Sequence, residues 1–207
     1  MVAIIDYRAG NLTSVRLALE HLGVACAITQ DPARILAAER VIFPGDGAAA
    51  EAMRNLRELA LLDTLRTAVD RSTPFLGICL GTQVIFDYSE EDGGTPCAGL
   101  MPGTVRRFQP ADPLCKIPQM GWNTMALKRP HPLFEGIEDE SEFYFIHSYY
   151  PAPADPAHVM GETEYAEARF ASAVGRGSLF ATQFHPERSG RIGLRLLRNF
   201  TRWDGTC

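Results

Sequence analysis

A cysteine between two glycines is the residue whose setting most resembles that of a nucleophile. Residues 77–81 read Gly-Ile-Cys-Leu-Gly and lie between a predicted strand and a predicted helix. This is the cysteine form of the G-x-S-x-G turn, a tight turn in which the glycines avoid backbone collisions and the central side chain projects from the sheet. The turn places Cys79 at a helix N-terminus, which favours the thiolate. On this motif alone, a buried structural cysteine is an equally good interpretation.

A thiolate nucleophile needs a group that carries its proton. Residues 183–187, Gln-Phe-His-Pro-Glu, follow a predicted strand, so His185 lies where catalytic groups of α/β folds gather. Glu187 is close enough to bond the second imidazole nitrogen and to hold the ring in one tautomer. A surface His–Glu pair would be the better interpretation of these two residues alone. Together with Cys79 they predict a Cys–His–Glu triad for acyl transfer.

Acyl transfer also needs donors for the oxyanion that forms on the substrate. The backbone N–H of Leu80, directly after the cysteine, is one candidate. A second is the turn at residues 44–47, Pro-Gly-Asp-Gly, which follows another predicted strand. An ordinary turn remains the alternative there, because Pro-Gly alone is common in turns.

Apolar runs and helical spacing alternate along the first part of the chain. Short apolar runs predict strands, and periodic apolar residues between them predict helices. Continuous apolar strands that alternate with helices predict a parallel sheet covered on both faces. The strands are predicted at 2–6, 24–29, 40–43 and 74–78, and the helices at 12–22, 48–59, 61–69 and through 84–86.

The pattern changes after about residue 95, where strand-like pieces dominate between turns that contain Pro and Gly. The expected fold class is therefore α/β, with a mostly parallel central sheet flanked by helices and an additional antiparallel or mixed portion. A final amphipathic helix is predicted near 191–203, and the Pro-rich segment 151–156 is predicted to be a surface loop. The later strands are predicted at 105–108, 123–127, 142–146, 170–174 and 179–184.

Composition narrows the classes of function that these residues can serve. The chain has 207 residues and a net charge of −5, which predicts one domain over residues 1–207 and no nucleic-acid partner. No apolar run reaches the roughly 20 residues of a membrane helix, and no leader is recognised, so a cytoplasmic protein is expected. The five cysteines are an odd set without a C-x-x-C pair. Neither a metal site of the zinc type nor a disulfide framework is therefore expected.

The three motifs at 44–47, 77–83 and 183–187 together resemble the class I (triad) glutamine amidotransferases over essentially the whole chain. The resemblance implies the flavodoxin-like architecture of that family. It also implies hydrolysis of glutamine to glutamate and ammonia through a γ-glutamyl thioester, without a cofactor.

Segments 6–11, 120–123 and 144–150 further resemble the glutaminase subunits of imidazole glycerol phosphate synthases, enzymes of histidine biosynthesis that also release AICAR. This resemblance implies a heterodimer with a (β/α)₈-barrel cyclase subunit that receives the ammonia.

The resemblance also implies a role for each matching residue. Cys79 would be the nucleophile, His185 the acid and base, and Glu187 the residue that orients the imidazole. His147 would be structural or would act behind the site. The oxyanion backbone would come from Gly45, Asp46 and Leu80, the glutamine would be held by Gly47, Gln83, Ser148 and Tyr149, and the partner would be met by Asn11, Trp122 and Arg188.

Two positions depart strongly from the family pattern. Arg8 stands where Gly is usual, and Asp46 stands where Val is usual, whereas Arg188 in place of Lys keeps the charge. A carboxylate aimed at the thiolate would oppose its ionisation. We therefore expect the Asp46 side chain to point away and to cap the helix that begins near Ala48.

Three other functions remain open at this stage. The first is a glutaminase subunit for anthranilate, aminodeoxychorismate or pyridoxal phosphate synthesis. The second is a catalytically silent interaction subunit, and the third is a thiol peptidase of similar fold. Segments 6–11 and 144–150 weigh against a glutaminase subunit of another pathway. The complete triad weighs against a silent interaction subunit, and Gln83 weighs against a thiol peptidase.

Overall fold

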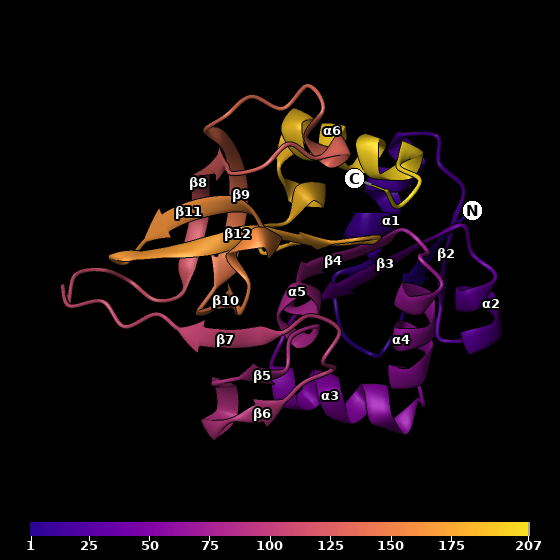
Figure 1. Cartoon of the computed structure of the whole chain (residues 1–207), viewed down its shortest axis with the longest axis horizontal. Helices are drawn as coiled ribbons and strands as arrows, with labels where there is room; N and C mark the ends of the chain where they lie inside the picture. Colours follow the sequence, from indigo (N-terminus) through magenta and orange to yellow (C-terminus); the bar gives the residue numbers. More distant parts are fainter. Residues whose placement is uncertain (207) are drawn as a thin grey trace.

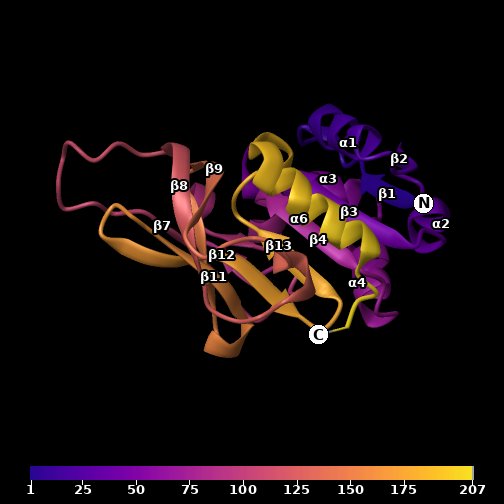
Figure 2. The same cartoon turned by 90° about the horizontal axis from the view of Figure 1, so that it is seen from above.

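A nine-stranded sheet runs through the molecule, in the order β2-β1-β3-β4-β13-β12-β11-β8-β9. Figures 1 and 2 together show its strands. The structure is a computed structural model and describes residues 1–206. The first five strands in this order are parallel and the remaining four pair antiparallel, which confirms the predicted α/β class. The parallel strands are β1 Val2–Ile5, β2 Cys26–Thr29, β3 Arg40–Gly45, β4 Phe75–Cys79 and β13 Leu179–Thr182. The antiparallel strands are β12 Ala168–Arg176, β11 Val159–Tyr165, β8 Gln119–Leu127 and β9 Ser141–His147.

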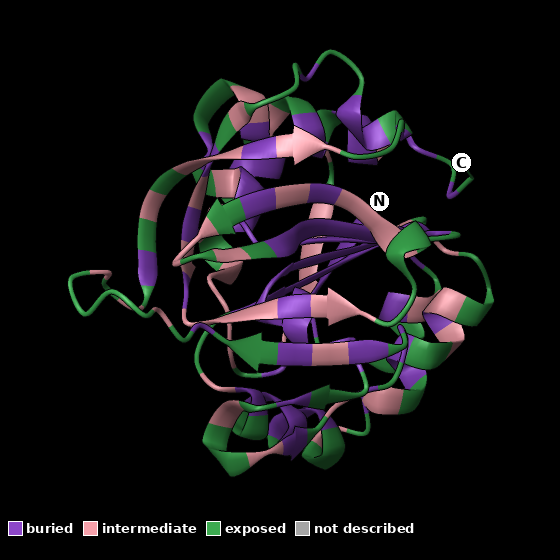
Figure 3. Cartoon of the chain, turned by 60° about the vertical axis from the view of Figure 1, so that its left-hand side comes forward, coloured by how far each residue is buried: buried purple, intermediate pink, exposed green. Residues whose placement is uncertain are grey.

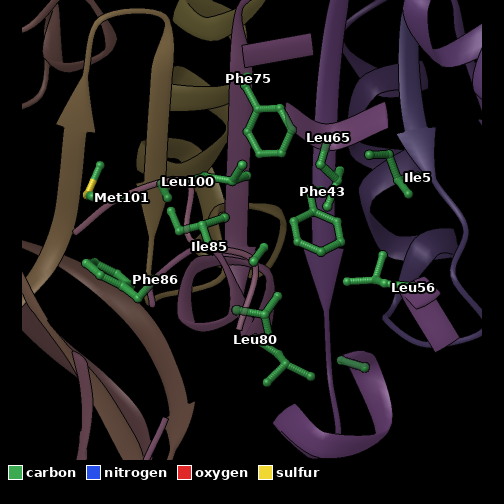
Figure 4. Close-up of a cluster of buried hydrophobic side chains, with 14 of the residues drawn as sticks. Ile5, Phe43, Leu56, Leu65, Phe75, Leu80, Ile85, Phe86, Leu100 and Met101 are labelled. Atoms are coloured by element: carbon green, nitrogen blue, oxygen red, sulfur yellow. The ribbon is translucent and has the colours of Figure 1, made fainter. Parts of the chain in front are cut away.

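Helices cover both faces of the parallel half (Figures 1 and 2). Successive strand residues point to opposite faces, so Phe43 packs in one hydrophobic cluster and its neighbour Ile42 in another. Figure 4 shows Leu56 and Leu65 of the covering helices in the cluster that contains Phe43. One face is covered by α1 Leu12–His21 and α6 Gly190–Arg202, and the other by α3 Ala49–Glu58, α4 Leu62–Asp70 and α5 Leu80–Val84.

A second sheet of four strands, in the order β10-β7-β5-β6, lies beside the antiparallel half. It corrects one prediction, because residues 151–153 are not loop but part of edge strand β10, paired antiparallel with β7. Proline is tolerated in an edge strand because one side of that strand needs no N–H donor. The strands are β10 Tyr149–Pro153, β7 Gly103–Arg107, β5 Tyr88–Ser89 and β6 Thr95–Pro96.

Sequence analysis missed several helices and strands, and it predicted one helix to be longer than it is. Helix α2, Pro32–Leu36, has only five residues, although its Asp31 cap and the proline at its first turn are typical start signals. Strand β11 carries two register shifts, which break the alternation that predicts a strand. Helix α5 ends at Val84 rather than continuing through 86. Residues 1–206 also contain four 3₁₀ turns: η1 Glu91–Gly93, η2 Pro132–Phe134, η3 Pro156–His158 and η4 Pro186–Arg188.

Burial is concentrated along the central strands (Figure 3). Strands β1, β4 and β13 are buried at every position, as expected for parallel strands covered on both faces. Among residues 1–206, none of the helices combines the length and the apolar character that a membrane span requires.

His131 is a buried histidine on the face of the sheet that α6 covers. Its ring lies 4.5 Å from that of Phe180 and 5.1 Å from that of Trp203, and its Nδ1 accepts a hydrogen bond of 3.1 Å from the backbone N–H of Leu133. Burial lowers the pKa of His131 to about 4, because the charged ring would lose its hydration. The folded protein therefore holds His131 neutral at pH 5, whereas the unfolded chain takes up a proton there.

We predict that His131→Asn reduces the loss of stability on acidification. The unfolded histidine titrates near 6.5 and the folded one near 4, so this residue removes stability as the pH falls through that window. Asn keeps an acceptor for the N–H of Leu133. The free energy of unfolding should fall by about 2 kcal/mol less between pH 7.5 and pH 5 than in the wild type. Urea unfolding at both pH values measures this, with exposed His21→Asn as control, and an unchanged pH dependence would refute the prediction.

Candidate active site

Two turns meet at the carboxyl ends of neighbouring parallel strands. Strands β3 and β4 pair with Gly45 opposite Cys79 and Pro44 opposite Ile78. The turn at 44–47 therefore begins beside the predicted nucleophile. This register brings a backbone segment rich in glycine next to a thiol, which is the arrangement that oxyanion stabilisation requires.

Cys79 occupies a strained turn between β4 and α5. Its φ of 55° and ψ of −111° are rare for a residue with a side chain, and such strain is typical of nucleophile turns. Both flanking glycines are required by packing. A Cβ at Gly81 would collide with the carbonyl of Phe43, and one at Gly77 would lie 2.9 Å from the Cβ of Ala181.

The thiol of Cys79 is buried, with 7% of the residue exposed. Its Sγ lies 3.8 Å from the carbonyl oxygen of Ile146 in β9 and 3.8 Å from Nε2 of Gln183. The antiparallel half of the molecule therefore supplies one wall of the site. Gln183 has no role in the sequence-based predictions, although it stands in the motif that contains the histidine.

His185 follows β13, which is the neighbour of β4 in the sheet. Its Nδ1 lies 2.8 Å from Oε1 of Glu187, so the carboxylate contact that the spacing predicted is present. The backbone holds the histidine at both ends, because its N–H donates to the carbonyl of Tyr144 and its carbonyl accepts from Oγ of Ser189. Ser189 also accepts from the N–H of Tyr144, a positioning role that sequence analysis did not find.

The charge on His185 depends on its two acidic neighbours. Burial alone would lower the pKa of His185, but Cys79 and Glu187 outweigh it and raise the pKa to about 10. Its Nε2 is buried and has no hydrogen-bond partner among residues 1–206. This nitrogen is therefore available to exchange a proton with the thiol or with a bound molecule.

A cavity of about 370 Å³ opens over the thiol. Two predicted residues, Gly45 and Glu187, do not line the cavity, and Glu187 bonds the ring of His185 instead. Trp122 is also outside it, 55% exposed on β8, where its ring lies 6.1 Å from that of Tyr144. The predicted residues that line the cavity are Asn11, Asp46, Gly47, Cys79, Leu80, Gln83, Ser148, Tyr149, His185 and Arg188.

Gln83 and Glu91 provide polar groups at the cavity wall. The Nε2 of Gln83 donates to the carbonyl of Tyr149 at 2.9 Å and to Oε1 of Gln183 at 3.0 Å, which fixes the amide. Glu91 was not predicted, because an acid in a polar loop carries no sequence signal. Its Oε2 accepts from the N–H of Ala49 at 2.7 Å, and burial raises the pKa of its carboxyl group.

The Asp46 side chain does not have the capping role that was expected from the sequence. It does not cap helix α3, whose first residue is preceded by Ala48 with no side-chain cap. Instead Oδ1 of Asp46 accepts a hydrogen bond of 2.8 Å from the N–H of Gly10. Glu91 takes the N–H at the start of α3, so the cap that Asp46 was expected to provide comes from a distant segment.

His147 lines the cavity and stays neutral. Burial lowers its pKa to about 4, an effect that the bond between Nδ1 and the carbonyl of Tyr149 only partly offsets. A neutral ring with Nδ1 protonated donates this bond at 2.7 Å. The other departure from the pattern, Arg8, adopts a φ of 66° at the surface and forms an ion pair of 3.1 Å with Glu58.

Comparison with known proteins decides the family. The model of the glutamine amidotransferase class-I family matches residues 3–203. The chain belongs to this family. It is 50% identical to the imidazole glycerol phosphate synthase subunit HisH of Aromatoleum aromaticum, over 98% of each chain, and 51% identical to that of Methylococcus capsulatus, over 98% of this chain and 96% of the relative. Within the family it belongs to the HisH group.

Solved structures share the fold at low sequence identity. A structure described as a glutamine amidotransferase superposes with a TM-score of 0.75 at 19% identity over the whole of both chains. The structure of PurLQS from Thermotoga maritima gives 0.75 at 18% identity over 97% of each chain. In the part of the chain that the structure describes, no group of three or more His, Cys, Asp or Glu side chains is arranged to hold a metal ion.

We predict that a glutamine analogue with an electrophilic γ-carbon labels Cys79 and spares the other cysteines. Cys79 alone among the four described cysteines lines the cavity. Burial raises the pKa of Cys97 to about 11 and also raises that of Cys26, so both thiols stay protonated at neutral pH. Peptide mapping by mass spectrometry identifies the labelled residue. Label found mainly on Cys26, Cys97, Cys115 or Cys207, the last of which lies outside the described residues, would contradict the assignment.

Proposed function

We propose that this chain is the glutaminase subunit of an imidazole glycerol phosphate synthase, formed by one domain over residues 1–207 and acting in the cytoplasm. It hydrolyses glutamine and delivers ammonia to a synthase subunit in histidine biosynthesis. The observation that carries the proposal is the pairing of Gly45 with Cys79, which sets the turn at 44–47 beside the thiol. The thiol also interacts with His185, whose Nδ1 bonds the carboxylate of Glu187. The identity of about half to HisH subunits supports the choice of pathway.

The geometry supports an acyl transfer in two steps. The Sγ of Cys79 attacks the γ-carbonyl carbon of glutamine, and the proton of the thiol is held on Nε2 of His185. The oxyanion lies between the N–H of Leu80 and the backbone of Gly45 and Asp46. His185 then gives its proton to the leaving ammonia, which leaves a γ-glutamyl thioester on Cys79. Water deprotonated by His185 hydrolyses the thioester and releases glutamate.

The α-ammonium group of glutamine has a charged complement in the cavity over the thiol. Two carboxylates line the cavity, Asp46 in the turn at 44–47 and Glu91. We assign the α-ammonium group to Glu91, because Asp46 belongs to the turn that faces the oxyanion. Gln83, with its amide fixed by Tyr149 and Gln183, and the backbone of Gly47, Ser148 and Tyr149 hold the remainder of the substrate.

The ammonia product requires a partner. In neutral water ammonia is mostly ammonium, which is not a nucleophile, so a sheltered route to the acceptor is needed. We propose a heterodimer with a (β/α)₈-barrel cyclase subunit, docked on the face that carries Asn11, Trp122 and Arg188. Trp122 and Met120 support this placement, because both are large apolar side chains exposed on β8.

The experiment that tests the function is ammonia release from glutamine by the purified chain, with and without a matching synthase subunit. We expect release to rise strongly with the partner and its ligand and to be abolished in Cys79→Ala, while synthesis from added ammonium salts continues. Retained turnover in Cys79→Ala would exclude the nucleophile assignment. A partner-independent full rate, or activation by an anthranilate or aminodeoxychorismate synthase instead, would exclude the proposed pathway.

We predict that Glu91→Gln raises the KM for glutamine by about tenfold or more and changes kcat by less than about twofold. The substitution keeps an acceptor for the N–H of Ala49 but removes the charge that binds the α-ammonium group, and a charge-assisted bond is about twice as strong as a neutral one. Steady-state kinetics in the complex measure both constants. Glu90→Gln, an exposed neighbour outside the cavity, is the matched control. An unchanged KM would show that Glu91 does not bind substrate.

A further inference from the structure

Gln183 is a buried glutamine that contacts the nucleophile directly. Its side chain is fully buried, and its Nε2 lies 3.8 Å from Sγ of Cys79. Gln183 directly follows β13, and His185 lies two residues further on, so one short segment carries both side chains to the thiol. The two steps of the acyl transfer use His185 and leave Gln183 without a part.

Neighbouring groups fix the orientation of the Gln183 amide. The carbonyl of Tyr149 can only accept, so the atom of Gln83 that lies 2.9 Å from it is the amide nitrogen. This nitrogen also donates to the Gln183 amide at 3.0 Å, so the atom that it meets there is Oε1. The Nε2 of Gln183 is therefore left to face Sγ of Cys79 as a donor.

Two contacts of equal length act on Cys79 in opposite senses. The carbonyl oxygen of Ile146 lies 3.8 Å from Sγ, where it accepts from a neutral thiol and repels a thiolate. The amide of Gln183 lies at the same distance and donates, and a hydrogen bond to the charged form of a group favours that form. Without the Gln183 amide, the carbonyl of Ile146 would act unopposed and would favour the neutral thiol.

A neutral substitution at position 183 leaves the charges around the thiol unchanged. His185 attracts the thiolate when the imidazole is protonated. Tyr7, which follows β1, stays neutral, because burial raises its pKa and the charges of Asp46 and Cys79 raise it further. The effect of the Gln183 amide can therefore be measured separately from these charges. The other ionisable groups near the thiol are Glu187, which bonds His185, and the cavity residues Glu91, His147, Tyr149 and Arg188.

We propose that Gln183 donates a hydrogen bond to the thiolate of Cys79 during glutamine hydrolysis, and that Gln83 holds the Gln183 amide in this orientation. This inference rests on the proposed function. The thiolate then has two donors, the imidazolium of His185 and the amide of Gln183. Because water displaces Sγ from the thioester as a thiolate in the second step, the same amide also stabilises the leaving group.

Gln183→Met tests the proposal, because Met is similar in length and has no N–H to donate. The free subunit is treated with iodoacetamide, a small neutral reagent, over a range of pH, and peptide mapping follows the rate of modification of Cys79. This rate depends on the fraction of thiolate. We expect the midpoint of the pH profile to move up by about one unit relative to the wild type. An unchanged midpoint overturns the proposal.

The complex with the synthase subunit gives a second measurement. In Gln183→Met, kcat/KM for glutamine should fall by about tenfold on the acid side of its pH profile and should recover above the shifted midpoint. Loss of support for Gln83 alone would instead raise KM equally at every pH and leave the iodoacetamide profile of the free subunit as in the wild type. That outcome also overturns the proposal.

Two further variants separate this effect from a general loss of stability. Asn199→Leu removes another buried amide, whose Nδ2 bonds the carbonyls of Leu133 and Glu135 outside the cavity, and it should leave the midpoint unchanged. An equal shift in this variant overturns the proposal. Gln83→Met frees the Gln183 amide and should move the midpoint in the same direction by less. If Gln183→Met does not fold, an unchanged midpoint in Gln83→Met overturns the proposal.

The iodoacetamide profile does not require catalysis. Absence of glutamine hydrolysis in the wild-type complex therefore contradicts the proposed function, and the profile of the free subunit still decides whether Gln183 donates to the thiolate.

Discussion

The pairing of β3 with β4 is the constraint on which the site depends. Parallel strands in this register end together, so the cysteine turn and the turn at 44–47 emerge side by side. The close approach of α5 to β3 is possible because Gly81 has no Cβ to meet the Phe43 carbonyl. A shift of one residue between these strands would reverse the faces of the strand residues and separate the thiol from the turn that faces it.

The two halves of the main sheet contribute different parts of the site. The parallel half supplies Cys79, and β13 brings His185 beside it. The antiparallel half supplies the carbonyl of Ile146 and, through the carbonyl of Tyr144, holds the N–H of His185, while Ser189 at the start of α6 holds its carbonyl. Because the thiol is mostly buried, these contacts restrict both its access and the direction from which a substrate reaches it.

Electrostatics within the site favour charge on one histidine and not on another. His185 and His147 are both buried, yet the pKa of the first is raised to about 10 and that of the second is lowered to about 4. The difference follows from neighbours, since His185 faces Cys79 and the Glu187 carboxylate whereas His147 bonds a backbone carbonyl among aromatic rings. One histidine is suited to proton transfer and the other to holding the wall of the cavity.

The sequence alone is enough to predict the fold class, most of the strand–helix order of the first half and the candidate triad of Cys79, His185 and Glu187. These depend on local signals, namely apolar periodicity, glycine spacing and the two-residue separation of His185 from Glu187. The partner of the Asp46 carboxylate, the place of Glu91 in the cavity and the edge strand at 151–153 were decided only by the tertiary structure. The physical reason is that each depends on a hydrogen bond to a residue distant in the chain, to Gly10, Ala49 and strand β7 respectively, and no local pattern encodes such a partner.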